Sequence, residues 1–168
     1  MKLIKPNAKY GKSWLEAMKE FKSEDRTGFW NYNGESKNVE DFVRIAKDHE
    51  KGKNLPKGWV PATTYWLIDN EKFIGHINIR HELNDFLMKV GGNIGYHIRP
   101  TERGKGCGTK ILELCLPKAK KLGLKKVLIT CDESNIASRK VIEKNGGQLE
   151  NKIKHEDGYK LRYWINLD

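Results

Sequence analysis

The chain has 168 residues and a formal net charge of +10 at pH 7, with 32% charged and 38% hydrophobic residues. This composition suits one globular domain spanning residues 1–168, and no apolar run approaches the roughly 20 residues needed to cross a bilayer. The N-terminus lacks the apolar core of a signal peptide, and the three cysteines have no metal-type spacing, so we expect reduced thiols in a cytoplasmic protein.

The basic charge is compatible with nucleic acid, an anionic membrane or an anionic cofactor as a partner. The sequence has no arginine-rich tail and no repeated aromatic-basic pattern, and its five histidines form no His-x-x-x-His pair that would indicate structural zinc. We therefore expect no nucleic acid, membrane or metal partner. We interpret the lysines chiefly as the surface of a bacterial protein.

The hydrophobic pattern of the N-terminal half predicts two helices and three strands. In chain order these are a strand at 3–5, a helix at 10–21, a helix beginning after Asn38, a strand at 63–68 and a strand at 73–82. The last two strands form a hairpin around a tight turn. Alternation along the second of them places Phe73, Ile77 and Ile79 on one face and a polar set on the other, namely His76, Asn78, Arg80 and Glu82.

The C-terminal half begins with a loop at 83–89 and a strand at 90–98, followed by a glycine-rich turn and an amphipathic helix. Pro117 within that helix is expected to kink or interrupt it. The remaining elements are a strand at 126–131, a helix closed by Gly146 and Gly147, and a final hairpin over 148–166.

The glycine-rich turn is the most informative segment of the chain. It carries the pattern Arg-x-x-Gly-x-Gly in Arg103, Gly106 and Gly108. Glycines let the backbone approach an anion closely, and the N–H groups and dipole of a helix N-terminus favour negative charge. The turn lacks the Gly-Lys-Ser/Thr of a Walker loop and the spacing of a dinucleotide fingerprint, so neither of those phosphate sites is predicted.

The pattern is similar to the pyrophosphate loop of the GCN5-related N-acetyltransferase (GNAT) superfamily. The similarity continues through a strand, a helix led by Asn135 and a closing glycine, and it covers about residues 90–150. The resemblance implies a mixed α/β (α+β) fold, with a central, mostly antiparallel twisted sheet of about six to seven strands flanked by about four helices. It also makes a homodimer possible, since members of the superfamily are often dimers.

The resemblance further implies that the chain binds acetyl-coenzyme A and transfers its acetyl group, by direct attack, to a primary amine of a small molecule or peptide. Backbone N–H groups of the turn would hold the pyrophosphate, through Arg103, Gly104, Lys105, Gly106, Cys107, Gly108 and Thr109. The preceding strand would pair with the pantetheine arm through Tyr96, His97, Ile98 and Arg99. Asn135 and Ser138 would contact the same arm, although Asn135 is also suited to cap its helix.

The chain departs from the superfamily at both usual catalytic positions. Ile142 stands where many members place a tyrosine acid, and Gly92 and Asn93 stand where several place a glutamate base. The candidate replacements are Glu82 or His81 as the base and Tyr96 or Ser138 as the acid.

The acceptor site is expected between the N-terminal helices and the loops at 23–37 and 50–60. The aromatic side chains of these loops suit either an acceptor pocket or a core: Phe29, Trp30, Tyr32 and Trp59. Two alternatives to N-acetylation of a small molecule or peptide stay open. The missing acid and base favour a non-catalytic coenzyme A-binding module, and the basic charge favours an aminoacyl-tRNA-type amine as the acceptor.

Overall fold

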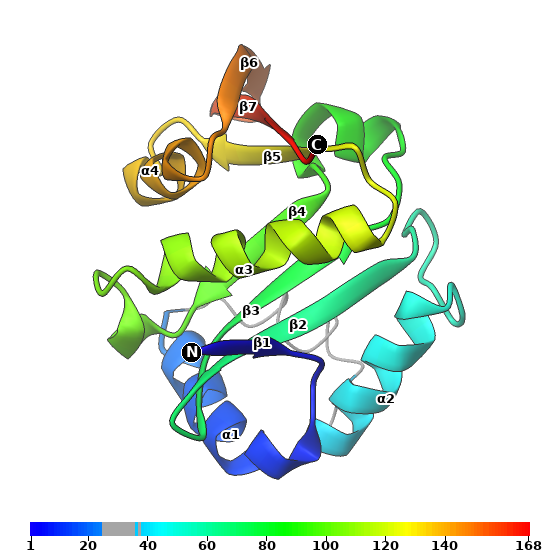
Figure 1. Cartoon of the computed structure of the whole chain (residues 1–168), viewed down its shortest axis with the longest axis vertical. Helices are drawn as coiled ribbons and strands as arrows, with labels where there is room; N and C mark the ends of the chain where they lie inside the picture. The colour runs from blue at the N-terminus through cyan, green and yellow to red at the C-terminus, as the bar shows by residue number, and fades with distance from the viewer. Residues whose placement is uncertain (25–35, 37) are drawn as a thin grey trace.

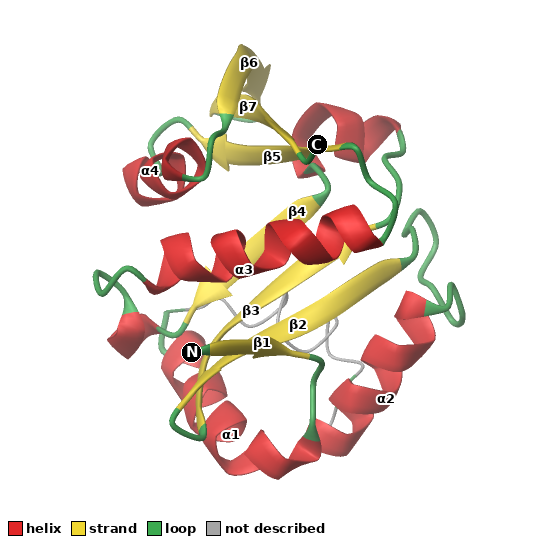
Figure 2. Cartoon of the chain, viewed as in Figure 1, coloured by secondary structure: helices red, strands yellow, loops and turns green. Residues whose placement is uncertain are grey.

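The computed structural model describes residues 1–24, 36 and 38–168. Figure 1 and Figure 2 show a mixed α/β fold in which helices pack beside two sheets. One antiparallel sheet has the strand order β1-β2-β3-β4, and a second has the order β5-β7-β6. The elements are β1 (Lys2–Ile4), η1 (Ala8–Tyr10), α1 (Gly11–Lys22), α2 (Val39–Glu50), β2 (Ala62–Asp69), β3 (Lys72–Arg80), η2 (Leu87–Gly91), β4 (Ile94–Ile98), η3 (Pro100–Glu102), α3 (Cys107–Lys121), β5 (Lys126–Asp132), α4 (Ile136–Lys144), β6 (Gln148–His155) and β7 (Gly158–Asn166).

Two apolar cores hold helices against the two faces of the first sheet (Figure 1). On one face, α3 packs its buried stripe against β3, in a cluster that includes Ile111 and Ile77. On the other face, α1 and α2 enclose Trp66 of β2, whose ring stacks 6.1 Å from Trp14 and lies 5.5 Å from Phe42. Burial of such large apolar side chains, worth about 2 kcal/mol each, fixes the helices to the sheet. The predicted fold class is confirmed, with its strands divided between two sheets.

The predicted face of Phe73 is wrong because a β-bulge interrupts β3. The register shifts opposite Leu67 and Ile68, which leaves Ile74 as the extra residue. The bulge reverses the alternation, so Phe73 packs in the core beneath α1 and α2, whereas Ile77 lies in the core beneath α3.

Local signals set the helix ends largely as predicted. Asn38 caps α2, since its side-chain oxygen accepts the backbone N–H of Asp41 at 2.8 Å. The predicted interruption at Pro117 does not occur. The helix α3 continues past it to Lys121, and the proline lies on the exposed side of the helix.

The segment predicted as a loop at 83–89 instead leads into the π-helical turn η2. The Asn84 side chain accepts the Leu87 N–H at 2.9 Å and so starts the turn. Donors from both sheets then hold its C-terminal carbonyls: Arg162 donates to Met88 at 2.8 Å, Thr130 to Val90 at 2.6 Å, and Arg80 to Gly91 and Gly92 at 3.0 Å. The turn therefore links the two sheets.

Asn93 joins the sheets directly at the start of β4. Its backbone N–H donates to the Leu128 carbonyl of β5 at 2.7 Å, and its side-chain oxygen accepts the Leu128 N–H at 2.8 Å. Its own carbonyl turns the other way and accepts the Arg80 N–H at 2.7 Å. Gly92 has φ +66°, and a Cβ there would lie 2.6 Å from the Leu128 oxygen, so only glycine permits this approach. β4 and β5 are thus held together at one end without forming a ladder among the described strands.

Residues 1–24, 36 and 38–168 contain neither a membrane-spanning helix nor a cluster of metal ligands. No helix there is long and apolar enough to cross a membrane, and no group of three or more His, Cys, Asp or Glu side chains is placed to hold a metal ion. The three cysteines are buried free thiols.

Replacing Asn93 with alanine should lower the free energy of unfolding by about 1–3 kcal/mol, because the buried Leu128 N–H loses its acceptor. Urea denaturation measures the loss. Asn166→Ala, at an exposed strand position, is the matched control and should change stability by less than about 0.5 kcal/mol. Equal stability of Asn93→Ala and the parent would show that the joint between the sheets does not depend on this side chain.

Candidate active site

The glycine-rich turn presents open backbone at the start of α3. Gly104 and Gly106 have φ of +75° and +78°, a left-handed conformation that other residues rarely adopt, and nothing lies within 4 Å of where their Cβ atoms would be. No side chain of the described residues caps α3 at Gly106, and the first-turn N–H groups of a helix have no intrahelical acceptor. This arrangement of open N–H donors at a helix N-terminus fits an anionic group such as a pyrophosphate.

The basic side chains beside the turn are engaged in ion pairs. Both terminal nitrogens of Arg103 donate to the carboxylate of Glu24 at 2.9 Å, and its Nε donates to the Ile98 carbonyl at 3.1 Å. Lys105 pairs with Glu102 at 3.1 Å. Arg103 therefore ties the turn to the end of α1, and the backbone of the turn is its anion-binding element.

Arg99 likewise positions the turn. Its buried guanidinium donates to Glu20 of α1 at 2.7 Å, and Glu20 also accepts from the backbone N–H and the hydroxyl of Thr101 at 3.2 and 3.0 Å. Burial alone would raise the pKa of Glu20, but the bonds from Arg99 and Thr101 outweigh it and lower that pKa. The Arg99 side chain thus points to α1, away from the predicted coenzyme contact.

β4 turns part of its backbone toward the gap beside β5. Along an antiparallel ladder, residues whose backbone bonds to the partner strand alternate with residues whose backbone faces away. Asn93 and Arg99, at the two ends of β4, both bond to β3 and so set the phase of this alternation. By this alternation His97 directs its backbone to β3, whereas Tyr96 and Ile98 direct theirs to the open edge. The predicted pairing with an extended arm therefore fits Tyr96 and the N–H of Ile98, whose carbonyl already accepts from Arg103. It does not fit the backbone of His97 or of Arg99, whose N–H donates to the Ile74 carbonyl at 2.8 Å.

Tyr96 and Ser138 meet between β4 and α4. Their hydroxyl oxygens lie 2.9 Å apart, and Asn135, at the start of α4, caps the helix by accepting the Ser138 N–H at 3.0 Å. Burial raises the pKa of Tyr96 to about 12, so its phenol stays protonated at neutral pH. Three residues predicted from separate parts of the sequence are thus brought together at the gap between the sheets.

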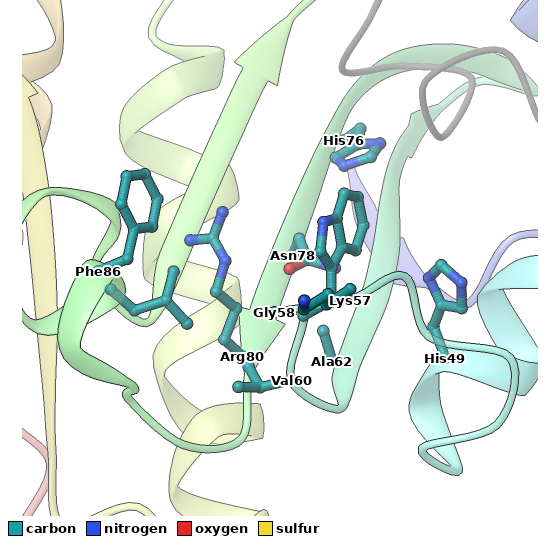
Figure 3. A pocket seen from close by; sticks show the side chains of 11 residues that line it. His49, Lys57, Gly58, Val60, Ala62, His76, Asn78, Arg80 and Phe86 are labelled. Carbon is teal, nitrogen blue, oxygen red and sulfur yellow. The ribbon is translucent and has the colours of Figure 1, made fainter.

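A cavity of about 440 Å³ opens on the face of β3 that is turned away from α3 (Figure 3). Its floor is the polar face of the strand, formed by His76, Asn78 and Arg80. The walls come from α2, the loop before β2 and the segment around η2, through His49, Lys57, Gly58, Trp59, Val60, Ala62, Phe86 and Leu87.

The charged groups that line this cavity are cationic. The half-buried Arg80 donates to the carbonyls at the end of η2, and Lys57 is exposed at the rim. Burial lowers the pKa of Arg80, and burial together with the charges of His97 and Arg80 lowers the pKa of His76 to about 3, so His76 is neutral. No described residue that lines the cavity is acidic.

The structure does not bring the predicted bases into the cavity. Glu82 is exposed beyond the end of β3. His81 turns toward β2, where its Nε2 lies 2.8 Å from the Thr63 hydroxyl, and burial lowers its pKa. Ile142, at the usual tyrosine position, is fully buried and offers no acid.

The predicted acceptor aromatics divide into two groups. Trp59 lines the cavity with 43% of its surface exposed, and its ring meets His49 edge-on at 5.7 Å. Phe29, Trp30 and Tyr32 lie outside the described residues. Phe86, which is 63% exposed, lies across the cavity from His49 in Figure 3. The hydrophobic pattern could not identify Phe86 as a lining residue of the cavity, because its segment has the periodicity of neither a strand nor an ordinary α-helix.

Residues 15–148 match the family model of the acetyltransferase (GNAT) domain. The chain therefore belongs to the GNAT acetyltransferase family, which confirms the resemblance stated from the glycine-rich turn. No curated protein sequence matches the chain.

Solved structures of several GNAT acetyltransferases share the fold. RimL, a ribosomal L7/L12 alpha-N-protein acetyltransferase in complex with coenzyme A, has a TM-score of 0.71 at 15% identity, over 98% of this chain and 92% of its own. The microcin C7 self-immunity acetyltransferase MccE, in complex with acetyl-CoA and AMP, has 0.68 at 17%, over 98% and 91%. A mutant of the spermidine N-acetyltransferase SpeG from Vibrio cholerae has 0.68 at 14%, over 99% and 95%.

Replacing Gly106 with valine should weaken coenzyme A binding at least tenfold, measured by calorimetry, because a branched Cβ blocks close approach to the turn. Gly123→Val is the matched control, since Gly123 also has a positive φ with open space around it but lies at the other end of α3. Both substitutions carry a similar backbone cost of about 1–2 kcal/mol. Equal coenzyme affinity in the two variants would contradict the assignment of the turn.

Proposed function

We propose that this chain is an acetyl-coenzyme A-dependent N-acetyltransferase that transfers an acetyl group to a primary amine of a small molecule or peptide by direct attack. The observation that carries the proposal is the juxtaposition, within a GNAT domain, of the open turn at α3, the free edge of β4 and the cavity on β3. The coenzyme A and acetyl-CoA complexes of RimL and MccE support the choice of coenzyme.

The coenzyme would lie along the gap between β4 and β5. N–H groups from Gly104 to Thr109 suit the pyrophosphate, and the open backbone of Tyr96 and the N–H of Ile98 suit the amides of the pantetheine arm. The hydrogen bonds of Asn93 close the gap at its other end. The arm is therefore directed toward the end of the acceptor cavity that Arg80 borders.

Acetyl-coenzyme A supplies the acetyl group as a thioester. Residues of the chain position the amine, favour its neutral form and protonate the departing thiolate. An amine attacks only in its neutral form. Desolvation in the cavity and the charge of Arg80 both lower the pKa of a bound ammonium, which raises its neutral fraction without a carboxylate base. Tyr96 donates its phenolic proton to the sulfur as the C–S bond breaks, and the Ser138 hydroxyl orients that phenol. The nitrogen loses one proton to solvent as the amide forms, and the phenolate of Tyr96 takes a proton back from solvent, so the reaction releases the free thiol and leaves the chain unchanged. The proposal assigns no base role to Glu82 or His81.

Two other functions differ in what they predict. A non-catalytic coenzyme A-binding module is favoured by the lack of an acidic group among the described lining residues, and it predicts coenzyme binding without acetyl transfer to any amine. Acetylation of an aminoacyl-tRNA-type amine is favoured by the net charge of +10 and predicts acceptor binding that weakens steeply with salt.

Thiol release from acetyl-coenzyme A, followed with and without a panel of amines, tests the proposal. At least one small amine should increase release well above the amine-free rate, with the acetylated amine visible by mass spectrometry. Coenzyme A at 100 times its dissociation constant should also stabilise the fold by about 2.7 kcal/mol in a thermal scan. Stabilisation without transfer to any amine would favour the binding module.

Tyr96→Phe should lower kcat by about a hundredfold, the usual contribution of one general acid, and should leave the coenzyme A dissociation constant unchanged. Tyr159→Phe, at an exposed tyrosine, is the control and should keep the parent kcat. An unchanged kcat in Tyr96→Phe would remove Tyr96 from the mechanism.

The loss in Tyr96→Phe should be equal at about pH 6 and pH 9, because a phenol with a pKa of about 12 is protonated at both. The raised pKa also makes stability fall as the pH rises above about 10, since the unfolded chain releases this proton first. Tyr96→Phe should lack this part of the alkaline loss, which urea unfolding at about pH 9 and pH 11 measures. An identical alkaline loss in both proteins would contradict the burial of this phenol.

A further inference from the structure

We propose that the acceptor amine carries an anionic group, a carboxylate or a phosphate-type group, that Arg80 and Lys57 bind, and that its apolar body lies between Trp59 and Phe86. This inference rests on the proposed N-acetyltransferase function and names the class of acceptor for the same cavity. Four observations support it: the charge of Arg80, which no described carboxylate balances, the hydrogen-bonded loop that carries Lys57, the exposed aromatic walls and the size of the cavity.

Arg80 differs from the other arginines of the described chain. The other five all pair with carboxylates: Arg44, Arg99, Arg103, Arg139 and Arg162. Arg80 has no carboxylate partner among the described residues, although it is half-buried on the cavity floor. A partly buried charge without an opposing charge is costly, and a cation left in this state within a cleft is a candidate to bind an anionic ligand.

The guanidinium of Arg80 has donors to spare for that ligand. Its NH1 donates to the carbonyls of Gly91 and Gly92 at 3.0 Å, which fixes the side chain at the end of η2. Five N–H donors are present in a guanidinium, so those on NH2 and Nε remain for an acceptor. Figure 3 shows the side chain extending into the space between Phe86 and Asn78. An anion there would complete a charge-assisted pair.

Lys57 supplies a second cation from the loop before β2, and this loop is held in place. The Asn84 side chain donates to the Gly58 carbonyl at 2.9 Å, and the Trp59 N–H donates to the Pro56 carbonyl at 3.0 Å. Lys57 thus lines the rim from a backbone whose position is set by hydrogen bonds. Two cations on one cavity attract an anionic acceptor and repel a polyamine such as spermidine.

The apolar walls describe the rest of the acceptor. Trp59 and Phe86 leave 43% and 63% of their surfaces exposed at the same cavity, and exposed aromatic rings that line a concave site mark it for an apolar ligand group. A volume of about 440 Å³ lies within the ordinary range for small-molecule sites. An aromatic or large aliphatic amino acid, or its phosphonate counterpart, has this combination of amine, anion and apolar body.

Matched amines test the inference directly. Acetyl transfer to L-phenylalanine and to its aminophosphonic acid analogue should show kcat/KM at least about tenfold above that for phenylalanine amide, phenethylamine or spermidine. Comparing the two anionic amines distinguishes a carboxylate from a phosphate-type ligand, and faster transfer to either of them supports the inference. Faster transfer to the neutral or polycationic amines would overturn it while leaving the proposed N-acetyltransferase function intact.

Charge variants assign the effect to the cavity. Lys57→Glu should reduce the preference for the anionic amine over its amide by about fivefold, whereas Lys53→Glu, at an exposed lysine of the same loop that does not line the cavity, should leave it unchanged. Arg80→Gln, which keeps N–H donors for the η2 carbonyls, should reduce the preference by about tenfold with coenzyme affinity retained. An equal preference in the parent, Lys57→Glu and Arg80→Gln proteins would overturn the inference.

Binding of the same amines to coenzyme A-loaded protein provides a measurement that does not depend on turnover. Calorimetric binding of L-phenylalanine or the aminophosphonic acid, weakened in Lys57→Glu and absent for the amide, would support the anionic ligand even if no amine were acetylated. In that case the proposed transfer reaction alone would fail. No binding and no turnover with either anionic amine, in a protein that binds coenzyme A, would overturn the inference.

Discussion

The paired hydrogen bonds between Asn93 and Leu128 are the constraint on which the rest of the site depends. They hold β4 and β5 together at one end, where Gly92 permits an approach that any side chain would prevent. Beyond this joint the strands belong to separate sheets, so the edge of β4 keeps backbone groups that no strand uses. A buried asparagine that satisfies both polar groups of Leu128 also avoids the cost of unpaired backbone at the junction.

The same joint explains a chemical departure. Positions 92 and 93, where several superfamily members carry a glutamate base, form the close contact with β5. Any side chain at position 92 would collide with the Leu128 carbonyl, and position 93 is buried, where an unpaired charge is costly. The chain thus uses these positions to hold the sheets together, and neither of them offers a carboxylate. Tyr96, bonded to Ser138 across that gap, is protonated because burial disfavours its anion.

Ion pairs fix the outer end of the gap in a comparable way. Arg99 and Arg103, at either side of η3, bind Glu20 of α1 and Glu24 just beyond its C-terminus, so the N-terminal helix holds the turn that precedes α3. The charges nearest the turn are therefore balanced by protein carboxylates, and its open N–H groups face outward. On β3 the balance is reversed, because Arg80 lines the cavity and has no carboxylate partner within the described part of the chain.

The sequence by itself determined the elements and the family, because hydrophobic periodicity, the cap at Asn38 and the glycine pattern at 103–108 are local signals. Local signals also led to the prediction that Tyr96 and Asn135 contact the coenzyme. Only the tertiary structure decided what depends on contacts between distant segments. The bulge at Ile74 arises from pairing with β2, and the turn η2 is held by donors from both sheets. The exclusion of Glu82 from the cavity, and the lack of a carboxylate beside Arg80 among residues 1–24, 36 and 38–168, likewise follow from the path of the folded chain, which no residue pattern records.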